Sequence, residues 1–162
     1  MNVHKGDQIF ENYGQPNYIY FLYHGFILTE NAHDCVLFND IKILRTDPVA
    51  QNIPSMWAKL NSAGFYSINP TFCLNNDKSV DRLNSFIRVK FDVSSTSSSF
   101  YGRLMDVENA VRSIIGARLV RLDSIKDRSE QSESSHMYSK KDMMLQQVEN
   151  ERKILTTLWN RI

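Results

Sequence analysis

The sequence lacks the features that mark several common classes of protein. It has no run of about 18 apolar residues, so no membrane-spanning helix is expected, and its first residues lack the apolar stretch of a secretory signal peptide. The 19 basic and 18 acidic residues leave a formal net charge of +1. This balance gives no reason to expect a nucleic acid or a bulk membrane surface as a partner.

Signatures of catalytic chemistry are also scarce. The two cysteines, Cys35 and Cys73, are too few and too far apart in the sequence for a metal cage, and no metal is expected. We predict that both are free thiols in a reducing compartment. Glycine-rich nucleotide-binding motifs, the zinc-protease helix motif and the serine nucleophile motif are missing. Cys35 has no evident histidine partner, which argues against nucleophilic catalysis.

The composition is that of a globular protein. Of the 162 residues, 42% are hydrophobic and 23% are charged, which suits one ordinary domain with an appended piece. Residues 7–13 have mixed strand character, and the aromatic residues 18–23 also read as a strand by propensity alone. A short apolar run at 35–38 predicts a further strand. The pattern then becomes helical, so we place a domain boundary near residues 35–50.

Four helices are predicted in the remainder of the chain. Pro54 suits a first helical turn, and Gly64 suits a helix end. Ser79 and Asp106 are the predicted N-caps of the second and third helices. The apolar stripe of the last helix is interrupted by charged residues at 151–152. The predicted helices span 54–63, 79–91, 105–125 and 139–162, with surface loops at 94–99 and 126–136.

The N-terminal motif carries a family resemblance. The run Gly6-Asp7-Gln8-Ile9-Phe10-Glu11-Asn12-Tyr13-Gly14 is followed by Asn17, an aromatic run and His24-Gly25-Phe26. It resembles the C-terminal end of a SET methyltransferase domain, in the subgroup of Rubisco large-subunit methyltransferase and actin-histidine methyltransferase. Residues 80–93 and 143–155 resemble parts of the helical substrate-binding domain of that subgroup.

This resemblance implies a mostly α fold. A small β-rich SET-domain remnant, residues 1–40, would be followed by an all-α substrate-binding domain, residues 41–162. The resemblance favours a short helix at 18–23 over the strand that propensity indicates. Asn17 would then cap the start of this helix and Gly25 would end it, although Asn17 also matches an asparagine of the family in this turn.

The resemblance assigns the acceptor site to Tyr13. In this family the tyrosine of the Tyr-Gly motif hydrogen-bonds the acceptor nitrogen and shapes the dry channel along which the methyl group passes. Without the resemblance, Tyr13 reads as the aromatic end of a strand with its ring in a core. We therefore predict Tyr13 as the catalytic residue, on the condition that the rest of the site is supplied.

Other aromatic residues complete the predicted site. Phe26 and Gly25 match the Gly-Phe that lies near the adenine of the methyl donor, and ordinary core packing would explain Phe26 equally well. Tyr18, Tyr23 and His24 are candidates for substrate binding, since aromatic rings favour cationic lysine states. Alternation in a half-buried segment also explains the two tyrosines, and a structural role is the simpler reading of His24. For His33-Asp34, a matching pair in a family loop, we favour a structural role.

The resemblance therefore predicts part of an S-adenosylmethionine-dependent protein N-methyltransferase, acting on lysine or on histidine. In the family, the methyl-donor loop and the Asn-His-x-Cys segment precede the matched part, so this chain alone is expected to be inactive. The alternative is a non-catalytic helical protein-interaction module with a vestigial SET edge. A protein substrate, a monomeric state and an intracellular location in cytoplasm, nucleus or plastid are expected.

Overall fold

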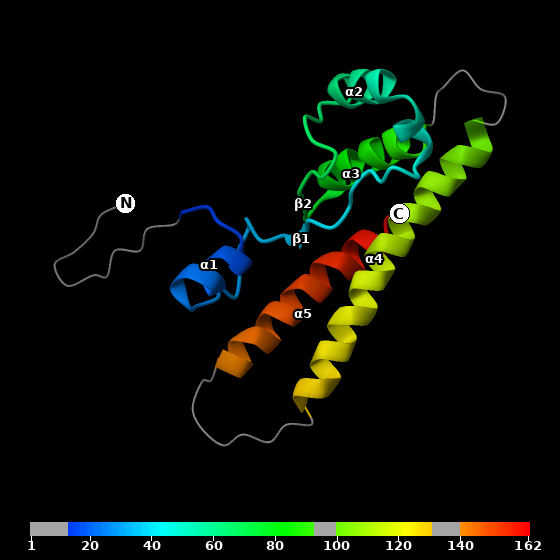
Figure 1. Ribbon diagram of the computed structural model, residues 1–162. Helices are drawn as coiled ribbons and strands as arrows, with labels where there is room; N and C mark the ends of the chain where they lie inside the picture. Colours follow the sequence, from blue (N-terminus) through cyan, green and yellow to red (C-terminus); the bar gives the residue numbers. More distant parts are fainter. Residues whose placement is uncertain (1–12, 93–99, 131–139) are drawn as a thin grey trace.

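The computed structural model describes residues 13–92, 100–130 and 140–162, with the backbone alone described at 100–104 and 129–130. Helices dominate this part of the chain, so the mostly α fold is confirmed at that level. Figure 1 shows the long helices α4 and α5 side by side, with α3 along the other part of α4 and α1 at one side of the molecule. The strand expected at 7–13 and the loop expected at 94–99 lie outside the described residues.

Helix α1 (Asn17–His24) forms where propensity alone indicates a strand. Pro16 precedes it with φ −69°, which is compatible with a helix start. Gly25 ends it at φ 71°, and its N–H donates to Phe21 O at 3.2 Å, as a left-handed C-terminal glycine does. The helix end at Gly25 is therefore confirmed. The prediction that Asn17 is a helix cap is wrong, because Asn17 lies in the first turn and its side chain makes no capping hydrogen bond.

Helix α2 (Ile53–Ser62) follows the short 3-10 helix η1 (Pro48–Gln51). The Asn52 side chain accepts a hydrogen bond from Ser55 N at 3.1 Å, and Pro54 stands in the first turn, where its missing N–H costs nothing. Gly64 adopts φ 75° just beyond the helix, as the sequence predicted. Lys59 of α2 forms an ion pair with Asp92, which follows α3 in the sequence.

Helix α3 (Asp77–Lys90) begins two residues before the predicted start. Its cap is Asn76, whose side chain accepts from Ser79 N at 3.0 Å, while the Ser79 hydroxyl accepts from Asn76 N at 3.1 Å. The prediction of Ser79 as the N-cap is therefore wrong. Ser79 is the third helical residue of a capping box, in which two side chains satisfy each other's backbone N–H groups.

Helices α4 (Phe100–Glu130) and α5 (Lys140–Trp159) run antiparallel to one another (Figure 1). The α4 helix starts before the predicted residue 105, so Asp106 lies inside the helix and the prediction that it is an N-cap is wrong. It also continues through residues 126–130, which the sequence assigned to a loop. Those residues are polar, yet arginine, lysine and glutamate are good helix formers, so their polarity does not end the helix. The rest of the predicted loop, 131–136, lies outside the described residues.

The two short strands pair antiparallel. β1 (Val36–Phe38) fits the predicted strand, and β2 (Phe72–Leu74) was not predicted. Val36 faces Leu74 and Phe38 faces Phe72 in the register. The prediction of two free thiols is wrong: Cys35 and Cys73 form a disulfide, because this pairing brings their Cα atoms to 5.3 Å. Cys35 is buried and Cys73 is exposed.

We call residues 36–92, 100–130 and 140–162 the helical body, and residues 13–35 the N-terminal segment. One hydrophobic core runs through the helical body. Its centre includes three aromatic rings, Phe65, Phe72 and Phe86, each at most 2% exposed and with centroids 5.1–6.1 Å apart. The strand residues Val36 and Phe38 belong to the same core. Within the described helices, none is long and apolar enough to cross a bilayer.

The two charged residues that interrupt the apolar stripe of α5, at positions 151–152, contact α4. Glu151 is 8% exposed and accepts from Arg118 Nη2 at 3.0 Å and from Gln147 Nε2 at 3.2 Å. Arg152 Nε donates to Asp123 Oδ1 at 2.6 Å, and this hydrogen bond raises the pKa of Arg152 above its usual value. The polar residues at 151–152 thus pair with polar residues of α4.

Candidate functional site

Four aromatic rings gather at the N-terminal segment, and we call them the ring cluster: Tyr13, Tyr20, His24 and Phe26. The Tyr13 and His24 rings are nearly parallel, with an interplanar angle of 6° and centroids 6.2 Å apart. Tyr20 stacks on Phe26 at 5.1 Å, and His24 lies 6.0 Å from Phe26 and 6.2 Å from Tyr20. Three of the predicted site residues, Tyr13, His24 and Phe26, therefore lie together.

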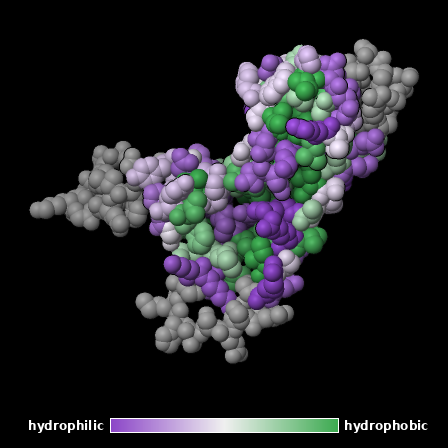
Figure 2. Space-filling model, viewed as in Figure 1, coloured by the Kyte–Doolittle hydropathy of each residue, from purple (hydrophilic) through white to green (hydrophobic). Residues whose placement is uncertain are grey.

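The ring cluster combines one buried anchor with exposed members. Tyr20 is 2% exposed, whereas Tyr13 is 58% and Phe26 43% exposed. In the view of Figure 2, hydrophobic residues reach the surface at the side where α1 lies. Exposed aromatic faces of this kind can stack on a planar base or contact a cationic group. Tyr13 is thus not buried among the C-terminal helices.

The remaining predicted site residues occupy other positions. Tyr23 is 72% exposed and Tyr18 is half-buried, and within the described residues neither makes a ring contact with the cluster. Gly25 ends α1, and its left-handed conformation turns the chain so that Phe26 returns to the rings of Tyr20 and His24.

Behind the ring cluster, a buried hydrogen-bond network is centred on Asn17, which is 1% exposed. The Asn17 amide nitrogen Nδ2 donates to Leu28 O at 2.9 Å and to Asp34 Oδ2 at 2.9 Å. Its Oδ1 accepts from Leu28 N at 3.1 Å and from Asn31 Nδ2 at 3.2 Å. Because an asparagine amide offers two donors and accepts two hydrogen bonds, every polar position of this side chain is used.

Asp34, which is 7% exposed, is the second centre of this network. Its Oδ1 accepts from Asn17 N at 3.0 Å and from Cys35 N at 3.0 Å. The carboxylate therefore joins the first turn of α1 to the residue that carries the disulfide. A carboxylate near the first N–H groups of a helix also complements the helix dipole. The Asn31 side chain adds a hydrogen bond to Gln15 O at 2.8 Å, so the turn before α1 is held as well.

Sequence reasoning underestimated this network. The resemblance to the SET family singled out Asn17, which was interpreted as a helix cap, and Asp34 was assigned to loop structure. A usable signal was present, since polar residues with short side chains stand in the loop at 30–34 directly before the strand at 36–38. Polar side chains that are buried in such a loop need hydrogen-bond partners, and the side chain of Asn17 could supply them.

The ring cluster can bind a ligand and position a reacting group. A tyrosine hydroxyl can donate to or accept from a nucleophile, and the neighbouring rings can exclude water on one side. Phe26, which is 43% exposed, offers an aromatic face on which a planar group can stack. Within the described residues, no group of three or more His, Cys, Asp and Glu side chains could hold a metal ion.

A scan against protein-family models gives no match, and comparisons with curated proteins and with solved structures give no significant match. The resemblance to SET methyltransferases therefore rests on the N-terminal motif and on the helical segments 80–93 and 143–155 of the sequence alone.

Proposed function

We propose that this chain contributes the acceptor side of a SET-type protein methyltransferase that uses S-adenosylmethionine. Tyr13 positions the acceptor nitrogen of a lysine, or of a histidine, and Phe26 lines the pocket of the methyl donor. The helical body docks the protein that is methylated. The observation that carries the proposal is the exposed ring cluster, in which Tyr13, His24 and Phe26 lie together and Tyr13 keeps 58% of its surface accessible.

Methyl transfer from a sulfonium to an amine is an in-line displacement. When bound, S-adenosylmethionine would supply the methyl group on its sulfonium sulfur, and this chain would hold the acceptor amine in line with the sulfur–carbon bond. The protein contributes mainly orientation and exclusion of water in such a step. A tyrosine hydroxyl at the mouth of the channel suits this task, and the Asn17–Asp34 network supports it by fixing α1 and the turn before it.

Phe26 suits a donor pocket because it is aromatic and 43% exposed. Stacking on its face would add binding energy with little specificity for the base. Tyr20 packs against Phe26 at 5.1 Å and so limits the orientations of that ring. Most of the donor pocket, including a glycine-rich loop and an Asn-His-x-Cys segment, has to be supplied in addition to these residues.

Reconstitution tests the proposal. The 162-residue chain is combined with a polypeptide that carries the donor loop and the Asn-His-x-Cys segment of a SET domain, and transfer of a radiolabelled methyl group to protein is measured. We expect transfer by the combination and none by the chain alone. Tyr13→Phe should lower kcat about 100-fold, because loss of the aligning hydroxyl misplaces the nucleophile.

Tyr66→Phe is the matched control. Tyr66 is 84% exposed and lies outside the ring cluster, so removal of its hydroxyl should leave transfer unchanged. Equal rates for Tyr13→Phe and the unmodified chain would contradict the assigned role. Peptide acceptors that offer only lysine or only histidine then identify the methylated residue.

The alternative is a helical interaction module without catalytic activity. A groove on the helical body, between α3 and α4, favours this alternative, because ligand binding there would involve no residue of the ring cluster. Failure of every reconstituted combination to transfer a methyl group, with partner binding retained by the helical body, would select this alternative.

A further inference from the structure

We propose that a groove on the helical body binds an extended acidic peptide segment of a partner protein. The groove lies between residues 37–44, the end of α3 and the middle of α4, and we call it the basic groove. Its cavity has a volume of about 620 Å³. This inference uses the helical body alone, so it can fail or hold independently of the methyl-transfer proposal.

The base of the groove is apolar. Ile87 of α3 and Ile114 of α4 contribute branched side chains, and Ala110 and Ala117 leave room between them. In the upper part of the molecule in Figure 2, hydrophobic residues lie between hydrophilic ones where α3 and this segment lie beside α4. An apolar base with a few polar side chains around it is the usual form of a ligand-binding site.

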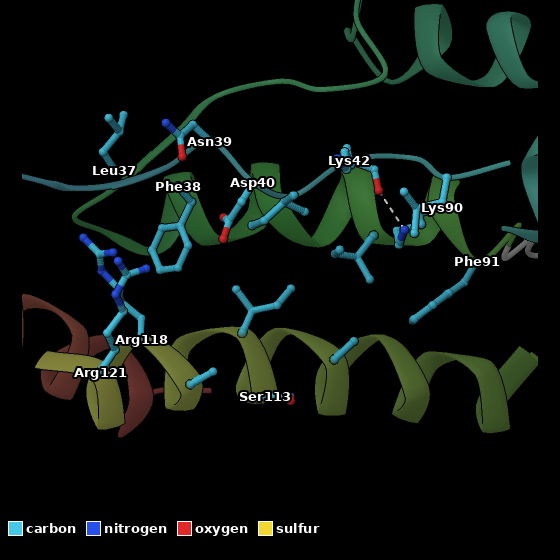
Figure 3. A pocket seen from close by; sticks show the side chains of 16 residues that line it. Leu37, Phe38, Asn39, Asp40, Lys42, Lys90, Phe91, Ser113, Arg118 and Arg121 are labelled. Carbon is cyan, nitrogen blue, oxygen red and sulfur yellow. Dashed lines mark hydrogen bonds between the residues drawn. The ribbon is translucent and has the colours of Figure 1, made fainter. Parts of the chain in front are cut away.

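Cationic side chains line the groove. Lys42, Lys90, Arg118 and Arg121 contribute four positive charges, against one carboxylate, Asp40. Figure 3 shows Arg118 and Arg121 reaching from α4 toward the end of the groove formed by Leu37 and Phe38.

Two of these cations are already engaged. Lys90 pairs with Asp47 and donates to Lys42 O at 2.7 Å, and Arg118 pairs with Glu151 at 3.0 Å. Within the described part of the chain, neither the Lys42 ammonium nor the Arg121 guanidinium pairs with a carboxylate. Both are therefore available to an acidic ligand, and complementary charge is what such a surface selects.

The backbone of the groove wall points to an extended ligand. Burial alternates along residues 41–44, with Ile41 and Ile43 buried and Lys42 and Leu44 exposed, which is the pattern of an extended chain. The N–H groups of Asp40 and Lys42 donate no hydrogen bond to any described residue, whereas Ile43 N, on the opposite edge of this extended segment, donates to Ile68 O at 2.8 Å. An added peptide strand could accept from such groups, as in β-strand addition to an open edge.

The length of the groove sets the size of the ligand. Eleven residues separate Ala110 from Arg121 along α4, which corresponds to about 17 Å at 1.5 Å per residue. An extended peptide covers that distance with about five residues at about 3.3 Å each. Alternating apolar and acidic residues would place one set on the apolar base and the other near Lys42 and Arg121.

Fluorescence anisotropy tests this inference. The probe is a fluorescein-labelled seven-residue peptide that alternates leucine with glutamate, added to the full chain. We expect saturable binding that weakens as the salt concentration rises. A Lys42→Glu, Arg121→Glu double variant should bind at least tenfold more weakly. Arg88→Glu is the matched control, because Arg88 is an exposed α3 residue outside the groove and its reversal should leave binding unchanged.

Further probes define the outcomes that overturn the inference. Equal binding of a glutamine analogue of the peptide would exclude recognition of acidic groups. Full binding of an analogue N-methylated at alternate residues would exclude pairing with the groove backbone. Tighter binding of a single-stranded oligonucleotide or of phosphatidylserine vesicles, lost in the double variant, would assign the groove to another polyanion. No binding of the acidic peptide to the folded chain would end the proposal.

Discussion

The helical body and the N-terminal segment are held together by different interactions. In the helical body, large apolar side chains such as Phe86 and Leu83 are fully buried, and its exposed ion pairs lie around them. In the N-terminal segment, the polar side chains of Asn17 and Asp34 are buried alongside Tyr20 and Cys35, and several aromatic rings remain exposed. Hydrogen bonds fix position through direction and distance, whereas apolar burial depends mainly on area. The N-terminal segment can therefore be ordered while its aromatic surface stays open.

Phe86→Ala should have the largest effect, and it should act on the helical body. Phe86 is 0% exposed and contacts the rings of Phe65 and Phe72, so its removal leaves a cavity in the core. We expect a loss of about 3–5 kcal/mol in the free energy of unfolding. Urea denaturation followed by circular dichroism measures it, with Tyr66→Ala as an exposed control that should change stability by about 0.5 kcal/mol or less. A loss below about 1 kcal/mol would contradict the described core.

Reduction of the Cys35–Cys73 disulfide should have the next largest effect. The bond closes a loop of 38 residues between β1 and β2, and removal of such a cross-link costs about 2–4 kcal/mol. Denaturation with and without a dithiol reductant measures the loss, and a Cys73→Ser variant should no longer respond to the reductant. If both thiols react with Ellman's reagent in the untreated folded chain, the disulfide does not form.

Asp34→Ala should cost less and act on the N-terminal segment. The substitution leaves the Asn17 backbone N–H and one hydrogen of its amide without a partner at a site that is 1% exposed. We expect a local loss of about 1–3 kcal/mol. Hydrogen exchange by mass spectrometry should show faster exchange in α1, with α3 and α5 unchanged.

Asp40→Ala is the control for this change, because Asp40 is exposed and makes no contact with the network. Uniform acceleration of exchange throughout the chain would show that the two regions do not respond separately. Unchanged exchange in α1 would show that the network does not hold the helix.

The two regions also differ in what the sequence could predict. Helix α2 was predicted closely because Pro54 and Gly64 mark its ends through backbone conformation, which is a local property. The disulfide depends on the pairing of β1 with β2, whose cysteines are 38 residues apart, and β2 is too short to give a clear signal. Such long-range pairing is not encoded in local propensity.

The candidate site was predicted in part for the same reason. The resemblance to the SET family pointed to Tyr13 and Phe26, and the structure places both rings beside His24. The role of Asn17 could not be read locally, because its partners Leu28, Asn31 and Asp34 are 11 to 17 residues away. A helix cap satisfies an asparagine with neighbouring N–H groups, and the sequence alone offers no means of preferring distant partners.

Glu149→Ala should have the smallest effect, and it gives the sharpest contrast with Asp34→Ala. Both substitutions remove a carboxylate that accepts hydrogen bonds, but Glu149 pairs with Lys126 across α4 and α5 at 3.5 Å with side chains 55% and 43% exposed. Water replaces the lost partner of Lys126, so the free energy of unfolding should change by about 0.5 kcal/mol or less. Urea denaturation of the two variants under the same conditions measures the difference. A loss for Glu149→Ala as large as that for Asp34→Ala would mean that burial does not decide the value of these carboxylates, and the contrast between the two regions would then have no physical basis.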